Sequence, residues 1–219
     1  MEQKYSEEKK QTHLFISYSA VYLILIVLLP RFGIIRGVLQ CISHTALGIT
    51  GVRIFHKEFE EGFRLWKTHT LRSFVYLLAA SIADILLVNA AVIPAALLGI
   101  NDIGGNTDAV SGIVQVLPLP VIILSLGILG PLTEEIIYRI LFVGKASLKL
   151  PSALCIILSS VLFALAHLEK ISLAGLICVL PAFADALVFA FSYHKTRNII
   201  IPAVLHVLNN SLAFIMMQK

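Results

Sequence analysis

The sequence predicts an all-α protein, a polytopic transmembrane bundle of about seven spanning helices. Of its 219 residues, 58% are hydrophobic and only 14% are charged, and the mean hydropathy is +0.90. Soluble domains contain about 25% charged residues, and no soluble core has room for so large a surplus of apolar side chains. Apolar runs of about 20 residues also recur along the chain, which is the length that a helix needs to cross a bilayer.

Seven runs are apolar enough to be spanning helices. In chain order they are residues 13–30, 33–54, 73–98, 115–148, 151–168, 171–193 and 198–217. The fourth run is too long for one straight span and contains Gly130 and Pro131. Because proline removes a backbone donor, we expect a bend or a break there. The polar residues 1–12 predict a cytosolic leader, and residues 13–219 predict a single membrane domain.

Basic residues predict the orientation of the bundle. Lys and Arg are frequent between Arg53 and Arg72 and absent from residues 99–112. Since cytoplasmic loops are rich in these residues, we expect the N-terminus inside and the C-terminus outside. The mixed aromatic and charged residues of 55–72 predict an amphipathic helix on the inner surface. The formal charge of +4 does not indicate nucleic-acid binding, because no basic stripe with interleaved aromatic residues is present.

Ionisable and amide side chains inside the apolar runs point to the C-terminal half. Such groups are costly in hydrocarbon and are functional candidates by default. The N-terminal half contributes Arg36, His44 and Asp84. The C-terminal half contributes Glu134, Glu135, Arg139, His167, Asp185, His206, Asn209 and Asn210. We therefore expect the chemistry to lie after residue 115.

The segment PLTEEIIYR supplies a candidate base. Glu135 and Arg139 are four residues apart on one helical face and can form an ion pair. Glu134 is rotated by about 100° from its neighbour and is left to act as a general base. The alternative is a salt bridge at a helix end, with Pro131 and Thr133 as capping residues.

Two later helices each carry a polar residue of catalytic type. Phe163 and His167 share one helical face, and so do His206 and Asn210. Taken alone, each set fits a hydrogen-bonded packing role. Taken together with Glu134, they can either activate a water and stabilise an oxyanion, or hold a metal ion with an open position. The chain has neither an HExxH zincin motif nor a GxSxG serine motif.

Three ordered motifs carry a family resemblance. EEIIYR (134–139), FALAH (163–167) and HVLNN (206–210) match the patterns EExxxR, FxxxH and HxxxN. Over about residues 115–215, the chain therefore resembles the CAAX prenyl protease and bacteriocin-processing (CPBP, or Abi) family of intramembrane proteases.

The resemblance implies an intramembrane endopeptidase and a role for each motif residue. Glu134 would activate the water, His167 would help to hold it, and His206 and Asn210 would bind the oxyanion. The supporting residues would be Glu135, Arg139 and Phe163. The family is commonly labelled as metalloproteases, in which case Glu134, His167 and His206 would hold Zn²⁺. A metal-free glutamate mechanism is the other reading.

The expected partners are a peptide or protein substrate at the membrane and the lipid bilayer, without nucleic acid. A bacterial plasma membrane is the expected location, where the resemblance implies bacteriocin processing, self-immunity or peptide maturation. Two alternatives remain open. One is a non-catalytic membrane immunity or scaffold protein, and the other is a transporter with Asp84 and Asp185 in a proton relay.

Overall fold

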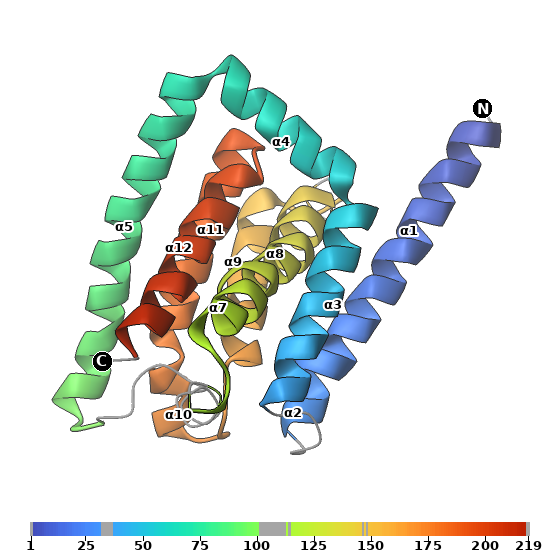
Figure 1. The fold of residues 1–219 in the computed structure, drawn as a ribbon. Helices are drawn as coiled ribbons and strands as arrows, with labels where there is room; N and C mark the ends of the chain where they lie inside the picture. The colour runs from blue at the N-terminus through green and yellow to red at the C-terminus, as the bar shows by residue number, and fades with distance from the viewer. Residues whose placement is uncertain are drawn as a thin grey trace.

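The computed structural model describes residues 2–31, 37–100, 113, 115–145, 147 and 149–217. The predicted loop 99–112 falls almost wholly outside these residues, as do Arg36 and the start of the second predicted run. The described residues form helices joined by turns, with no strand among them. The helices lie side by side as a bundle (Figure 1). The all-α membrane bundle is thus confirmed.

The N-terminal half supplies α1 (Glu2–Tyr22), η1 (Leu23–Leu28), α2 (Leu29–Arg31), α3 (Val38–Ile54), α4 (His56–Thr68) and α5 (Thr70–Leu97). The C-terminal half supplies α7 (Leu119–Ile122), η2 (Ile123–Leu129), α8 (Gly130–Glu135), η3 (Ile136–Lys145), α9 (Ser152–Ala166), α10 (Leu173–Cys178), α11 (Leu180–Thr196) and α12 (Ile200–Met216). The η segments are π-helical. Helix α1 begins within the predicted leader, so those residues continue the first helix.

Each of the seven predicted runs contains a helix, but the helices differ in their fitness to span a bilayer. Among the described residues, three stretches are long and apolar enough alone, namely Thr70–Leu97, Leu119–Lys145 and Leu173–Thr196. Helices α3 and α4 would make a fourth span together, although they are bent by 72°. The others are shorter apolar helices. The length of a run in the sequence therefore overstated the number of full spans.

Of the bend or break expected at Gly130 and Pro131, the structure shows no break. Leu119–Lys145 is one helical span of 27 residues, in which these two residues begin α8 between the π-helical segments η2 and η3. Wider turns provide an alternative bonding pattern where a proline lacks its N–H. This span also lies at the centre of the bundle. In its most apolar stretch of 18 residues, 67% of the residues are buried, whereas the corresponding share in Thr70–Leu97 is 11%.

Helix α4 lies across one end of the bundle and joins α3 to α5 (Figure 1). It buries Phe59 and Gly62 against the other helices, while Glu61 and Arg64 form an exposed ion pair. One face is thus apolar and packed and the other is charged, as predicted for residues 55–72. Helix α10 lies at the opposite end of the bundle.

Gly48 allows α3 to approach the central span closely. A Cβ at this position would lie 2.6 Å from Leu129 Cβ and 2.8 Å from the Leu129 carbonyl oxygen. We expect Gly48→Ala to lower the free energy of unfolding by about 1–3 kcal/mol, because backbone atoms must move apart. Thermal unfolding in detergent measures this. Ala46→Val adds volume at an exposed position of the same helix and should leave the melting temperature unchanged. Equal effects of both changes would contradict the close-approach argument.

Candidate active site

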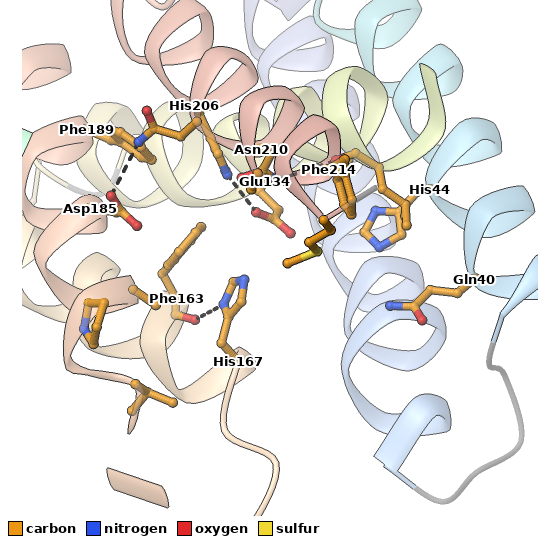
Figure 2. Close-up of a pocket in the computed structure, with 18 of the residues that line it drawn as sticks. Gln40, His44, Glu134, Phe163, His167, Asp185, Phe189, His206, Asn210 and Phe214 are labelled. Carbon is orange, nitrogen blue, oxygen red and sulfur yellow. Dashed lines mark hydrogen bonds and ion pairs between the residues drawn. The ribbon is translucent and has the colours of Figure 1, made fainter. Parts of the chain in front are cut away.

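Three motif-bearing helices meet at a cavity of about 330 Å³ in the C-terminal half of the bundle. Glu134 from α8, Phe163 and His167 from the end of α9, and His206 and Asn210 from α12 all line it (Figure 2). The remaining two motif residues, Glu135 and Arg139, lie behind the cavity wall and are fully buried. The structure therefore brings together the residues that the motifs single out.

His206 lies between two carboxylates. Its Nε2 is 3.4 Å from Glu134 Oε2, and its Nδ1 is 2.9 Å from Glu135 Oε1. The ring also stacks on Phe189, with centroids 4.9 Å apart. A neutral imidazole has one donor and one acceptor, whereas the protonated ring can donate to both carboxylates. The contacts on both sides thus fix the ring between the two acids.

The predicted ion pair between Glu135 and Arg139 is confirmed. Arg139 Nε lies 3.2 Å from Glu135 Oε2, and neither side chain is exposed. The guanidinium carbon is 5.0 Å from the ring centroid of Phe163 and 5.2 Å from that of Phe189. Aromatic faces attract a cation electrostatically, so the buried charge is surrounded by one carboxylate and ring faces.

Glu134 differs from the prediction in one respect. Its expected separation from Glu135 was based on a rotation of about 100° along a helix, yet both carboxylates contact the same imidazole. The ring of His206 reaches them with opposite nitrogens. Glu134 is 8% exposed and lines the cavity, whereas Glu135 does not. Access to the cavity and the pairing of Glu135 with Arg139 distinguish the two acids.

His167 ends α9 with its ring held by its own helix. Its Nδ1 lies 2.9 Å from the carbonyl oxygen of Phe163, and the two rings are 4.6 Å apart. Because a carbonyl only accepts, Nδ1 carries the proton. In the neutral ring Nε2 is then an acceptor. Phe163 thus supports His167 through both its backbone and its side chain.

Asn210 lines the cavity, and its side-chain amide contacts the central span. Its Nδ2 donates to the carbonyl oxygen of Leu126 at 3.4 Å. The neighbouring Asn209 contacts two acids, with Nδ2 at 2.7 Å from Asp84 Oδ2 and 3.4 Å from Asp185 Oδ1. The motifs single out Asn210, but Asn209 and Asp185 line the same cavity.

The expectation that all the chemistry follows residue 115 is incomplete. Gln40 and His44, one turn apart on α3, form part of the cavity wall (Figure 2). Asp84 reaches the polar cluster from α5. His44 and Asp84 are polar residues within apolar runs, and this pattern marked them in the sequence as functional candidates. Nothing in the sequence revealed that α3 and α5 pack against the motif helices.

The residues present do not fit a metal site in this arrangement. Within the described part of the chain, no three His, Cys, Asp or Glu side chains form a group that could hold a metal ion. Glu134 and His206 are already paired with each other. Zn²⁺ held by Glu134, His167 and His206 therefore stays a prediction.

Comparisons with known proteins agree with the site geometry. Residues 116–212 match the family model described as type II CAAX prenyl endopeptidase Rce1-like. The C-terminal half is therefore similar to this family of CAAX prenyl endopeptidases. The candidate membrane peptidase YdiL of Bacillus subtilis (strain 168) is 34% identical over 118 residues, which cover 54% of this chain. The alignment spans 45% of that Bacillus protein, less than half its length. No solved structure shows a significant match.

Residues 116–212, which match the family model, contain every motif residue of the cavity, while His44 lies outside them. His44 is 5% exposed, and its Nδ1 has no hydrogen-bond partner among the described residues. Replacing an unpaired buried polar group by an apolar one of similar shape is nearly neutral or stabilising. We therefore expect His44→Phe to keep or raise the melting temperature in detergent.

His206→Phe is the matched variant for this prediction. It removes the hydrogen bond to the buried Glu135 and the ion-pair partner of Glu134, and it should cost about 1–3 kcal/mol for the acceptor left unsatisfied. Both proteins are compared by thermal unfolding in the same detergent. If His44→Phe were as destabilising as His206→Phe, His44 would have a partner within the protein.

Proposed function

We propose that this protein is an intramembrane endopeptidase that hydrolyses a peptide bond near the bilayer surface with a water activated by glutamate. The observation that carries the proposal is the convergence of Glu134, His167 and His206 on one cavity from three helices. These helices bear the three ordered motifs and lie within residues 116–212, which match the family model. The pairing of Glu134 with His206, 3.4 Å apart, supports concerted proton transfer and charge stabilisation at that cavity.

The proposed reaction begins with a water in the cavity. The Glu134 carboxylate takes one proton from the water, and the hydroxide oxygen forms a bond to the carbonyl carbon of the peptide. His167 Nε2, an acceptor in the neutral ring, orients that water. Protonated His206 and the Asn210 amide stabilise the oxyanion. For Asn210 this requires its amide to leave the Leu126 carbonyl, which it contacts at 3.4 Å.

Collapse of the tetrahedral intermediate completes the reaction. The carbon–nitrogen bond breaks, and Glu134 returns its proton to the leaving amine. The products are a new carboxylic acid and a new amine, the acid then passes its proton to the amine, and the residues return to their starting states. Glu135 and Arg139 take no part in the bond changes. Their proposed role is to hold His206 in its place, since Glu135 contacts its Nδ1 at 2.9 Å.

The proposed setting is the plasma membrane of a bacterium, where the substrate would be a bacteriocin precursor or a peptide under maturation, or the activity would provide self-immunity. The relative in Bacillus subtilis supports this setting. The apolar spans support a multi-pass membrane protein.

The test is hydrolysis by the purified protein in detergent micelles or proteoliposomes. A library of apolar peptides is incubated with it in ¹⁸O-labelled water, and the products are identified by mass spectrometry. We expect one ¹⁸O atom in the new carboxylate and no covalent peptide–enzyme intermediate. A non-catalytic immunity or scaffold protein would give no product at all. Product without the label, or a trapped acyl-enzyme, would contradict direct attack by water.

Chelator treatment distinguishes the metal-free mechanism from a zinc mechanism. We expect hydrolysis to be unchanged after dialysis against EDTA or 1,10-phenanthroline, because no group of metal ligands is formed among the described residues. Metal content is measured in parallel by mass spectrometry of the digested protein. Loss of activity upon chelation, with recovery by added Zn²⁺, would replace the metal-free mechanism by a zinc mechanism.

One polar cluster favours the transporter as a second candidate. Asn209 bridges Asp84 on α5 and Asp185 on α11 at the edge of the cavity. Paired acids inside a membrane bundle are typical of proton relays. Proton or solute flux across proteoliposomes, abolished by Asp84→Asn, would support this reading. Hydrolysis without flux would exclude it.

A further inference from the structure

A second, smaller cavity lies at the end of the bundle covered by α4. It has a volume of about 160 Å³ and is formed where α4, the start of α5 and the connection from α11 to α12 meet. Its polar lining combines His69, Arg72, Ser73, Tyr76, Thr196 and Asn198. No carboxylate is present among its described lining residues. Cationic and neutral donors without an acid suit an anion with several acceptor oxygens.

Asn198 provides the observation that points to a ligand. The side chain is 2% exposed, and its Oδ1 accepts a hydrogen bond from the Ile200 backbone at 3.0 Å. This contact fixes the orientation of the amide, so the other atom is the NH₂ donor. That Nδ2 is buried and has no hydrogen-bond partner in the described part of the chain. A buried donor normally has an acceptor, and an oxygen of a bound ligand would supply it.

Arg72 supplies an available positive charge. Its side chain is exposed, and its guanidinium carbon lies 5.5 Å from the ring centroid of Tyr76. No ion pair joins it to a carboxylate among the residues that the structure describes. By contrast, Arg64 on α4 is paired with Glu61 at 2.6 Å. The guanidinium at the cavity is therefore held by a ring face and remains able to bind an anion.

The surface beside the cavity identifies the kind of anion. Helix α5 exposes a row of large apolar side chains next to Arg72 and Tyr76, namely Leu71, Phe74, Val75 and Leu78, which are 56–80% exposed. In a spanning helix such residues face the acyl chains of lipids. Leu65 and Ile201 add apolar walls to the cavity itself. A ligand bound here would meet donors at one end and hydrocarbon at the other.

We propose that this cavity binds the phosphate of an anionic phospholipid, with its acyl chains along α5. Arg72 and the Asn198 amide contact the phosphate oxygens, and the amphipathic α4 lies over the site at the membrane surface. Basic pockets between helices at the cytoplasmic face recognise such headgroups. This site is separate from the peptidase cavity and does not depend on the proposed hydrolysis.

The test measures lipid binding to the purified full-length protein by native mass spectrometry and by thermal unfolding. The probes are dioleoylphosphatidylglycerol, dioleoylphosphatidylcholine and inorganic phosphate. We expect the phosphatidylglycerol to raise the melting temperature more than either other probe. Arg72→Gln should weaken its binding about fivefold, because one basic side chain contributes about 1 kcal/mol at an anionic surface. Arg72→Lys should restore part of the binding.

Two further variants make the test specific to the cavity. Lys67→Gln removes a neighbouring exposed charge that does not line the cavity, and it should bind like the wild type. Asn198→Asp keeps the acceptor for Ile200 but loses the donor, and it should bind more weakly. Equal binding by Arg72→Gln and Lys67→Gln would overturn the proposal. So would an equal response to phosphate and to phosphatidylglycerol, which would indicate a site for a free anion.

Discussion

Glu134→Gln is expected to abolish peptide hydrolysis, with a fall in kcat of about 10²–10⁴, the usual contribution of a general base. Glutamine keeps the shape of the side chain and can still contact His206, but it cannot accept a proton from water. The measurement is the rate of product formation from a cleaved peptide, at equal amounts of folded protein. The variant should still bind the peptide, because only the proton acceptor is lost.

Glu61→Gln is the matched control for this change. It removes a carboxylate from the exposed face of α4, at the end of the bundle away from α10, and it should hydrolyse at the wild-type rate. The melting temperatures of both variants show whether each is folded. If Glu134→Gln kept half of the wild-type rate, Glu134 would not be the base, and the proposed mechanism would fail.

Arg139→Met is expected to cause the largest loss of stability. It leaves Glu135 fully buried without its cation, and breaking a buried ion pair typically costs about 3–5 kcal/mol. Methionine fills much of the space among the rings of Phe163 and Phe189, so the lost charge dominates the effect. Unfolding by heat or by a denaturing detergent, followed by the helical signal in circular dichroism, measures the change.

The double variant Glu135→Gln, Arg139→Met separates charge from packing. With both charges removed, most of the stability should return, because no unpaired charge remains buried. Arg64→Met, in the exposed pair with Glu61, should cause no measurable change, since exposed pairs contribute little. A double variant as unstable as Arg139→Met would mean that Arg139 acts through its packing and not through its charge.

The helices and the motif residues could be predicted because both depend on local sequence. Long apolar runs indicate helices directly, and the spacing of Glu135 and Arg139 gives their pairing without knowledge of any other helix. The continuity of the helix at Gly130 and Pro131 has a local cause of another kind. Proline removes a hydrogen bond, but the neighbouring π-helical turns keep the span continuous. Sequence patterns for ordinary helices do not report such turns.

The rest of the site depends on how distant helices pack. The contact of His206 with both Glu134 and Glu135 requires α12 to lie beside α8 in one particular register. The same holds for His44, which reaches the cavity from α3. A single sequence contains no information on the registry between helices. The sequence could therefore identify the polar residues within apolar runs, but not which of them contact one another.

The arrangement around His206 has a consequence for electroneutrality in the bilayer. With the imidazole protonated, two carboxylates and two cations are gathered within one small volume, and the set of Glu134, Glu135, Arg139 and His206 is neutral. Isolated charge is costly in hydrocarbon, whereas a balanced set is tolerated. When Glu134 accepts a proton, the negative charge moves to the substrate oxygen and stays beside the same cations. The reaction would then shift charge over a few ångströms without creating a net charge in the membrane.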